Sequence, residues 1–372
     1  MRVGLDLLYL VPGESGGRET YARELVPAML ECSPELDLVA FVNRDAGRLL
    51  AGELGATRSV VVPVSGRGRA GWALGELALV SVAARRAGVD LVHSMANFAP
   101  AWGGFRRVVT IHDLQYMVLP ELLSWPVRTA TSALVSLGAH RADRIIAVSE
   151  TGRQEVAAGL GVERARIDVV RNGVRPPPPE PATRGVRARY GLEERPFALA
   201  VATNLPHKNL PVLFDALRRI NPERRPVLVL AGHGTTDRAL RGQAEAAGVI
   251  QDVRLLGALN AQEIDGLYTL ASCLVLPTLH EGFGLPVLEA MARSLPVACS
   301  DIPVLREVAG DCAVYFDPRR AQEIAGAIEA VTGDEALAGR LRRLGVERAA
   351  SFSWARAAAG TVASYRAALA TA

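Results

Sequence analysis

Short apolar runs recur along the whole chain and alternate with longer stretches rich in alanine, leucine and arginine. Short β-branched runs of this kind are typical of strands buried in a parallel sheet, and the longer stretches are typical of the connecting helices. In the first half the pattern predicts strands over Arg2–Leu7, Leu36–Val42, Ser59–Pro63, Val89–His93, Arg107–Ile111, Arg144–Val148 and Ile167–Val170. In the second half it predicts strands over Phe197–Ala202, Val227–Ala231, Val253–Leu256, Cys273–Leu276 and Val297–Ser300.

A proline-rich segment separates these two series of strands. Pro176–Pro179 are four consecutive prolines, which cannot join a helix or a central strand. A length of 372 residues also exceeds the usual size of one domain. We therefore expect an α/β protein with two doubly wound, Rossmann-like domains, residues 1–174 and 175–352, that face each other across a cleft. The alanine-rich tail Ser351–Ala372 predicts a last helix.

The composition excludes several classes of protein. The 42 basic and 39 acidic residues give a net charge of +3, too even a balance to indicate a nucleic-acid partner. The start of the chain is typical of a buried strand and not of a signal peptide, and no apolar run is long enough for a membrane span. The cysteines share no metal-ligand spacing, and we expect a reducing, cytoplasmic environment. They are Cys32, Cys273, Cys299 and Cys312.

Polar or glycine-rich loops follow several of the predicted strands. In doubly wound sheets, ligands bind beyond the carboxyl ends of the strands. These loops are therefore predicted to gather the binding groups at the functional edges of the two sheets. They are Gly13–Gly17, His112–Asp113, Ser149–Glu150, His207–Asn209, His233–Gly234 and His280–Gly284.

The most informative loop leads into a predicted helix. Gly282 and Gly284 would let the backbone approach a ligand closely, and Pro286 suits the first turn of a helix. The free N–H groups and positive dipole end of that helix would favour an anion such as a diphosphate. Glu281 on the loop could reach a sugar hydroxyl, and Glu289 two turns later could reach a ribose diol. An ordinary strand–loop–helix junction with solvated glutamates is the alternative interpretation.

The segment from His280 to Met291 resembles the Glu-x7-Glu signature of the family 4 retaining glycosyltransferases, which have the GT-B fold. The resemblance extends over nearly the whole chain. Gly16–Tyr21 resembles the glycine loop of that family, and Arg171–Val174 resembles the segment that closes its first domain. Thr203–Asn209 resembles a loop that carries a phosphate-binding lysine, and Val304–Gly310 resembles a stretch after the last main strand.

This resemblance implies roles for individual residues. Lys208 would neutralise the diphosphate of the donor, Glu281 would contact the transferred sugar and Glu289 would bind the ribose. His112 would contact the sugar from the acceptor domain, so that His112, Lys208 and Glu281 form the catalytic set. The remaining donor-binding residues would be Gly16 and Gly17 near the phosphates, with the amides of Gly282, Phe283, Gly284 and Leu285 as a cradle.

The resemblance also implies an activity and an arrangement of the tail. The enzyme would transfer a hexose with retention from a nucleotide-diphosphate sugar to a glycan, lipid-linked or small-molecule acceptor. It would need no metal ion and no cofactor, and the sequence has no Asp-x-Asp motif. Similar segments are common in mannosyltransferases of polysaccharide biosynthesis, which favours GDP-mannose over a UDP-sugar. The final helix, residues 353–372, would cross back onto the first domain, with Phe352 and Trp354 as anchors.

Two residues depart from the family pattern. His207 stands where an arginine is usual, which leaves one less permanent positive charge beside the phosphates and increases the dependence on Lys208. Ser294 stands where a glycine is usual after the Glu-x7-Glu helix, and we expect this to change only a helix cap.

Several other residues carry weaker signals. We expect His93 and His140 to be structural, while His233 could either approach the nucleotide or remain unused. Arg67, Arg69 and Trp72 form a basic, glycine-rich loop. This loop would either make a weak peripheral contact with a membrane or lipid-linked acceptor at the inner membrane face, or simply be solvated.

The sequence leaves three classes of alternative function to weigh. A sugar-nucleotide epimerase or a disaccharide phosphorylase could share the fold and motif. A sugar-nucleotide-binding module without catalysis is disfavoured because Lys208, Glu281 and Glu289 are all present. A two-domain solute-binding protein would need an export signal, which the start of this sequence does not resemble.

Overall fold

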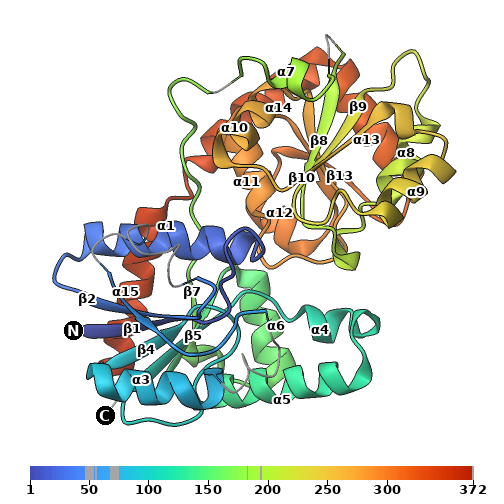
Figure 1. The fold of residues 1–372 in the computed structure, drawn as a ribbon. Helices are drawn as coiled ribbons and strands as arrows, with labels where there is room; N and C mark the ends of the chain where they lie inside the picture. Colours follow the sequence, from blue (N-terminus) through green and yellow to red (C-terminus); the bar gives the residue numbers. More distant parts are fainter. Residues whose placement is uncertain (47–53, 55–56, 68–74, 182, 193–194, 371–372) are drawn as a thin grey trace. The chain divides into compact units, whose positions relative to one another are not determined.

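The computed structural model describes residues 1–46, 54, 57–67, 75–181, 183–192 and 195–370. It contains two compact units, one formed by residues 1–173 with 353–372 and the other by residues 174–352. Each unit is built on one parallel sheet with helices packed around it (Figure 1). Residues 176–181 of the proline-rich segment form neither helix nor strand, as predicted.

The sheet of the first unit has the strand order β3-β2-β1-β4-β5-β6-β7, with every pair parallel. All of its strands were predicted from the apolar runs, with ends that differ by at most two residues. They are β1 (Arg2–Leu7), β2 (Asp37–Val42), β3 (Arg58–Val61), β4 (Leu91–Ser94), β5 (Arg106–Ile111), β6 (Arg144–Ala147) and β7 (Ile167–Val169).

The helices of the first unit bury the faces of this sheet, and helix α15 comes from the far end of the chain. It lies beside α1 and packs against β5 and β6, so the tail completes the first unit. The helices are α1 (Gly17–Cys32), η1 (Gly75–Leu79), α3 (Val80–Ala87), α4 (Gln115–Val118), η2 (Pro120–Leu122), α5 (Trp125–Arg141), α6 (Glu150–Leu160), η3 (Arg164–Arg166) and α15 (Trp354–Ala370).

A buried histidine ties α15 to the sheet. His93 Nδ1 lies 2.7 Å from the hydroxyl of Tyr365, and His93 Nε2 lies 2.8 Å from Thr110 Oγ1. Burial lowers the pKa of His93 to about 3, so the imidazole is neutral and serves as a hydrogen-bonding link. The interpretation of His93 as a structural residue is confirmed. The anchor Trp354 is also buried, with its ring 6.2 Å from that of Tyr21.

The sheet of the second unit has the order β10-β9-β8-β11-β12-β13 and is also parallel throughout. Its edge strand β13 was not predicted, because it is four residues long and mostly half-buried, without the continuous apolar run of its neighbours. The strands are β8 (Phe197–Val201), β9 (Val227–Ala231), β10 (Val253–Gly257), β11 (Cys273–Leu276), β12 (Val297–Ser300) and β13 (Ala313–Phe316).

The helices of the second unit cover both faces of this sheet. Helices α8 and α13 pack together over one core, while α11 packs on α14. The helices are α7 (Val186–Arg189), η4 (Pro206–Lys208), α8 (Val212–Arg219), α9 (Arg238–Ala246), η5 (Ile250–Asp252), α10 (Ala261–Leu270), α11 (Leu285–Ala292), α12 (Pro303–Ala309), α13 (Ala321–Gly333) and α14 (Glu335–Ala349). No helix in the described part of the chain is long and apolar enough to cross a membrane.

Both sheets share one topological feature that matters for binding. The strand order reverses between β1 and β4 in the first unit and between β8 and β11 in the second. At such a switch point the loops that follow the two strands leave toward opposite faces of the sheet and open a crevice at the carboxyl edge. The loops after β1, β4, β8 and β11 are therefore where each unit can bind a ligand.

Candidate active site

The switch point of the second unit brings together two charged residues that are far apart in the sequence. Lys208 ends the short helix η4 after β8, and Glu281 lies in the loop after β11. Lys208 Nζ lies 2.6 Å from Glu281 Oε1, and the two side chains are only 17% and 10% exposed. A short contact between an ammonium and a carboxylate is a charge-assisted hydrogen bond, stronger than a neutral one. Two of the predicted catalytic residues thus meet in one unit.

Contacts to the backbone join the loop after β8 to the loop after β11. The carbonyl of His207 accepts a hydrogen bond from the N–H of Leu279 at 2.7 Å, and Thr278 Oγ1 lies 3.1 Å from the same oxygen. Asn209 adopts a left-handed conformation with φ of 54°, and its Nδ2 donates to the carbonyl of Pro318 at 2.7 Å. His207 itself is buried. The position of Lys208 is therefore fixed by the backbone on both sides of it.

Composition carries a signal for Lys208 that motif spacing does not. It is the only lysine in the chain, among 42 lysine and arginine residues. Lysine carries a compact point charge on a flexible stem, whereas arginine presents a wide planar fork. A chain that uses arginine at every other basic position but lysine here indicates a place where the smaller cation is required.

The loop after β11 ends in a backbone conformation that only glycine tolerates. Gly284 has φ of 100°, and a Cβ atom there would lie 2.5 Å from Leu305 Cδ2. Helix α11 begins at the next residue, Leu285, with Pro286 in its first turn as predicted. Its first N–H groups and positive dipole end are suited to an anion, the kind of ligand that the sequence predicts there. The ring of Phe283 is buried 5.9 Å from that of Phe352, so only the backbone of Phe283 can serve the site.

Glu289 lies on α11 and is held by residues that sequence reasoning missed. The hydroxyl of Tyr268 donates to Glu289 Oε2 at 2.8 Å, and an Arg293 N–H donates to the Glu289 carbonyl at 3.2 Å. Arg293 is fixed in turn by Asp265, at 2.7 Å. Burial raises the pKa of Glu289. The Glu289 carboxyl is thus oriented before any ligand arrives, by partners that only the folded chain brings near.

The glycine loop of the first unit follows β1 and ends in helix α1. Gly16 has φ of 56° and precedes the first helical residue, Gly17. The N–H of Gly13 donates to Glu19 Oε2 and the N–H of Val11 donates to Ser15 Oγ, both at 2.8 Å. The loop is therefore a built structure that presents the start of a 16-residue helix at the switch point.

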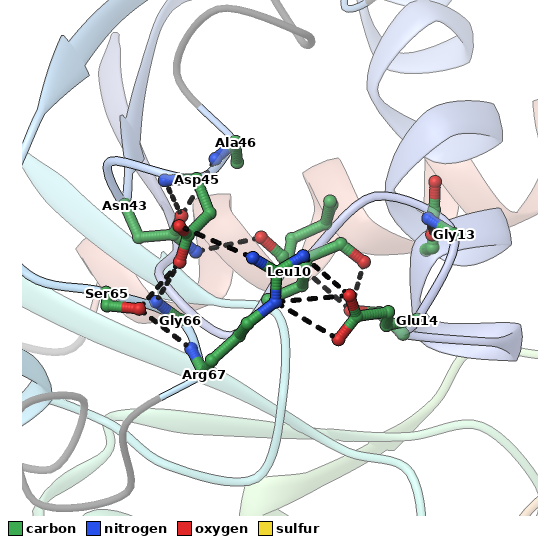
Figure 2. Close-up of polar contacts among 12 residues, drawn as sticks. Leu10, Gly13, Glu14, Asn43, Asp45, Ala46, Ser65, Gly66 and Arg67 are labelled. Atoms are coloured by element: carbon green, nitrogen blue, oxygen red, sulfur yellow. Dashed lines mark hydrogen bonds and ion pairs between the residues drawn. The ribbon is translucent and has the colours of Figure 1, made fainter.

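Loops after the neighbouring strands brace the glycine loop from the side (Figure 2). Asn43, after β2, is fully buried and donates from Nδ2 to the carbonyls of Leu8 and Leu10, both at 2.8 Å. Arg67, after β3, donates to Glu14 Oε1 at 2.6 Å. Arg67 is thus paired within the first unit. Its partners in the predicted basic loop, Arg69 and Trp72, lie outside the described residues.

His112 follows β5 and is oriented by the segment after β4. Its Nε2 lies 2.8 Å from the carbonyl of Met95, and its backbone N–H donates to Asn97 Oδ1 at 2.9 Å. Burial lowers the pKa of His112 to about 4. The imidazole is therefore neutral at pH 7, with the proton on Nε2 because that atom faces a carbonyl, and Nδ1 remains a hydrogen-bond acceptor. Asn97, in a left-handed conformation, was not found from sequence.

Structural contacts or exposure describe the other residues that the sequence singled out. Ser149 caps α6 by accepting the N–H of Gly152 at 2.9 Å, which accounts for its place after β6. His140 is exposed on α5 and lies 2.8 Å from the carbonyl of Ser136, in agreement with a structural role. His233 is exposed on the loop after β9. Cys273 and Cys299 are buried in strands β11 and β12, as expected.

Two doubly wound parallel sheets in one chain are the architecture of the GT-B class of α/β proteins, and solved structures agree. Sucrose-phosphate synthase from Thermosynechococcus elongatus superposes with a TM-score of 0.79 at 22% identity, covering 98% of each chain. HepE of Anabaena, solved in complex with UDP and glucose, superposes with a TM-score of 0.78 at 19% identity, covering 98% of this chain and 99% of its own. At these identities the likeness establishes the fold.

Sequence profiles identify the family. The profile described as "Glycosyltransferase Family 4" matches residues 15–176, and that of "Glycosyl transferases group 1" matches residues 185–348. The chain belongs to the group 1 / family 4 glycosyltransferases and is a glycosyltransferase, which confirms the expectation from the sequence.

Curated relatives agree with this family. O-antigen chain mannosyltransferase B of Escherichia coli is 28% identical over 74% of both chains. O-antigen chain mannosyltransferase RfbU of Salmonella typhimurium is 27% identical, and the match spans 57% of each chain.

Proposed function

We propose that this glycosyltransferase transfers a hexose, with retention of anomeric configuration, from a nucleotide-diphosphate sugar to a glycan, lipid-linked or small-molecule acceptor. The observation that carries the proposal is the Lys208–Glu281 pair beside the start of α11, at the switch point of the second sheet. This arrangement puts a cation, a carboxylate and a helix N-terminus where a doubly wound sheet binds its ligand.

The second unit is assigned to the donor. The ammonium of Lys208 has three N–H donors, so it can keep its bond to Glu281 and still bind a phosphate oxygen. The amides from Gly282 to Leu285 bind the same diphosphate, and Glu281 accepts from a hydroxyl of the transferred sugar. Glu289, oriented by Tyr268, accepts from the ribose hydroxyls. From the first unit, Gly16 and Gly17 serve the phosphates, and neutral His112 accepts from a sugar hydroxyl through Nδ1.

In the proposed reaction the bond between the anomeric carbon and the diphosphate breaks while a bond to the acceptor oxygen forms on the same face. The proton of the acceptor hydroxyl passes to an oxygen of the departing diphosphate. The chain itself positions the reactants and stabilises the negative charge that develops on the leaving group. This mechanism uses no metal ion or cofactor, so turnover is expected to survive treatment with EDTA.

We favour mannose as the sugar and GDP-mannose as the donor, in polysaccharide biosynthesis. The names of both relatives, O-antigen chain mannosyltransferases, support this assignment. A UDP-sugar is the alternative, since HepE was solved with UDP and glucose.

The decisive test combines binding with donor turnover. Thermal-shift measurements with GDP, UDP, ADP and TDP identify the nucleotide, since a ligand at 100 times its dissociation constant stabilises by about 2.7 kcal/mol. The matching nucleotide sugar is then incubated with the enzyme alone. A transferase leaves the donor intact or hydrolyses it slowly. Conversion to an epimer, or binding of none of the four nucleotides, would refute the proposal.

The two glutamates are expected to separate binding from transfer. Glu289→Ala removes a hydrogen-bonded carboxylate from the ribose and should weaken free nucleoside diphosphate about tenfold or more. Glu281→Ala should leave that affinity nearly intact and impair transfer. Calorimetric titration of both variants with nucleoside diphosphate makes the comparison, with Glu281→Gln and Glu289→Gln as isosteric controls. Equal weakening by both alanine variants contradicts the division of roles.

A further inference from the structure

The first unit contains an open groove of about 560 Å³ between helices α4 and α5. Tyr116 and Met117 line it from α4, and Arg128, Ser132 and Ser136 line it from successive turns of α5. Helix α4 begins three residues after His112, beyond the carboxyl end of β5. The groove therefore lies at the functional edge of the first sheet, in the unit assigned to the acceptor.

Arg128 gives the groove an uncompensated positive charge. It is half-buried, and among the described residues its guanidinium has neither a hydrogen-bond acceptor nor an acidic partner. Arg106 and Arg144 in the same unit are paired, with Asp143 at 2.8 Å and with Asp168. Helix α5 contains no acidic residue, and Arg128 lies near its positive N-terminal end. A half-buried, unpaired guanidinium fork favours a phosphate, which it can bind through two hydrogen bonds.

Hydroxyl groups line the same groove as this charge. The buried hydroxyl of Tyr116 lies beside Ser132, but has no hydrogen-bond partner of ordinary geometry among the described residues. Burial raises the pKa of Tyr116 to about 12, so the hydroxyl is a proton donor at neutral pH. An unsatisfied buried hydroxyl is costly unless a ligand pairs with it. The groove thus offers donors to a phosphate and to the sugar attached to it.

Exposed apolar side chains lie on both of the helices that form the groove. Met117 lines it, Val118 follows, and both side chains are more than one-third exposed. Trp125, at the start of α5, is 69% exposed. A tryptophan beside an arginine at a helix start is typical of surfaces that meet the boundary between lipid and water. A soluble phosphate would leave these side chains without contact, whereas a lipid chain would cover them.

We propose that the groove between α4 and α5 binds the acceptor as a sugar linked to a lipid phosphate. Arg128 binds the phosphate, the hydroxyls of Tyr116 and Ser132 bind its oxygens or the adjoining sugar, and Met117, Val118 and Trp125 contact the start of the lipid chain. The inference rests on the proposed function and names the acceptor class for it.

The test titrates the full chain, with its nucleotide site saturated, against three probes. These are farnesyl phosphate in phosphatidylcholine vesicles, phosphatidylglycerol in the same vesicles at equal charge, and inorganic phosphate in solution. Farnesyl phosphate should bind best. Arg128→Gln should weaken it about tenfold or more, the scale for losing a hydrogen bond to a charged group. Arg141→Gln, which removes the same charge from the exposed end of the same helix, should change it less than twofold.

A second pair of measurements separates the lipid from the phosphate. Met117→Ser should weaken farnesyl phosphate and leave inorganic phosphate unchanged. Equal losses from Arg128→Gln and Arg141→Gln would overturn the site. Inorganic phosphate binding as tightly as farnesyl phosphate would replace the lipid-linked acceptor by a soluble one. Equal binding of phosphatidylglycerol would indicate a general anionic surface. Arg128→Gln should bind nucleoside diphosphate like the parent, so failure of the donor assignment would be seen separately.

Discussion

The two units share one strand order at the switch point, yet the groups placed there differ in charge. In the second unit a lysine and a carboxylate form an ion pair beside the N-terminus of α11. In the first unit His112, in the loop after the nearby strand β5, is kept neutral by burial, and its Nε2 faces the carbonyl of Met95. The fold therefore sets where a ligand binds, and the loops set which charge it meets. A site for a diphosphate needs cations, whereas a site for sugar hydroxyls needs uncharged hydrogen-bonding groups.

Acid should expose this difference most strongly. His93 and His112 have pKa values lowered to about 3 and about 4, against about 6.5 in an unfolded chain. The unfolded state therefore binds more protons below pH 6.5, and stability falls as the pH falls. At pH 5 the two residues together should cost about 4 kcal/mol of unfolding free energy relative to pH 8. Urea unfolding at the two pH values measures this loss.

The variants His93→Gln and His112→Gln serve as controls for the acid effect. Each variant should remove about half of the loss of unfolding free energy. The buried carboxyls Asp6 and Glu289 act in the opposite direction, because their raised pKa values make the folded protein more stable in acid. The difference between parent and variant isolates the imidazoles. A pH dependence identical in parent and variants would mean that His93 and His112 are not held neutral.

Removal of the Lys208 ammonium from the second unit should lower turnover. We expect Lys208→Ala to lower turnover by about 10²-fold, the scale for losing a group that stabilises developing charge. Lys208→Arg should recover little, because the planar fork does not fit a site with 17% exposure. Arg320→Ala, which removes an exposed basic side chain of the same unit, is the control. Turnover of Lys208→Ala within threefold of the parent contradicts the assignment.

A smaller difference concerns two helices of the first unit that end at a glycine and helix α11 of the second, which is followed by a serine. Helices α3 and α6 end at Gly88 and Gly161, both left-handed. Ser294, just after the C-cap of helix α11, has φ of 57°, and the N–H of Leu295 bonds to the carbonyl of Ala290 as in a Schellman motif. Because glycine adopts this conformation without strain, Ser294→Gly should stabilise the protein by about 1 kcal/mol. Chemical denaturation measures it, and Ser351→Gly, outside the left-handed region, should not stabilise.

The smallest effect on stability is expected from breaking the exposed ion pair between Arg67 and Glu14 in the first unit. Arg67 and Glu14 are 61% and 39% exposed, and such pairs contribute little because water and salt screen them. Arg67→Ala and Glu14→Ala should leave the melting temperature unchanged within error at physiological salt. A clear fall for either variant would show that the brace around the glycine loop stabilises the unit as a whole.

The sequence was sufficient for what depends on local pattern and insufficient for what depends on distant partners. Buried parallel strands are continuous apolar runs, so β1, β9, β11 and β12 were predicted residue for residue. The contact of Lys208 with Glu281 joins residues 73 positions apart. The tautomer of His112 is set by the carbonyl of Met95, and a residue pattern does not show which backbone atom a side chain will face.

The conformation of Ser294 shows a different limit. The departure from the usual glycine was visible in the sequence, and a changed helix cap was the expectation. Its left-handed backbone is seen only in the folded structure. A residue type indicates which conformations are easy, but not which one the surrounding chain imposes.

The single lysine allows this enzyme to be labelled chemically at one side chain. Apart from the terminal amine, Lys208 is the only primary amine in the chain, and it belongs to the ion pair proposed to hold the donor. Reductive methylation with isotope-labelled formaldehyde would therefore introduce one side-chain signal into the whole spectrum. That signal would report directly on nucleotide arrival, without mutation and without assignment of the remaining resonances.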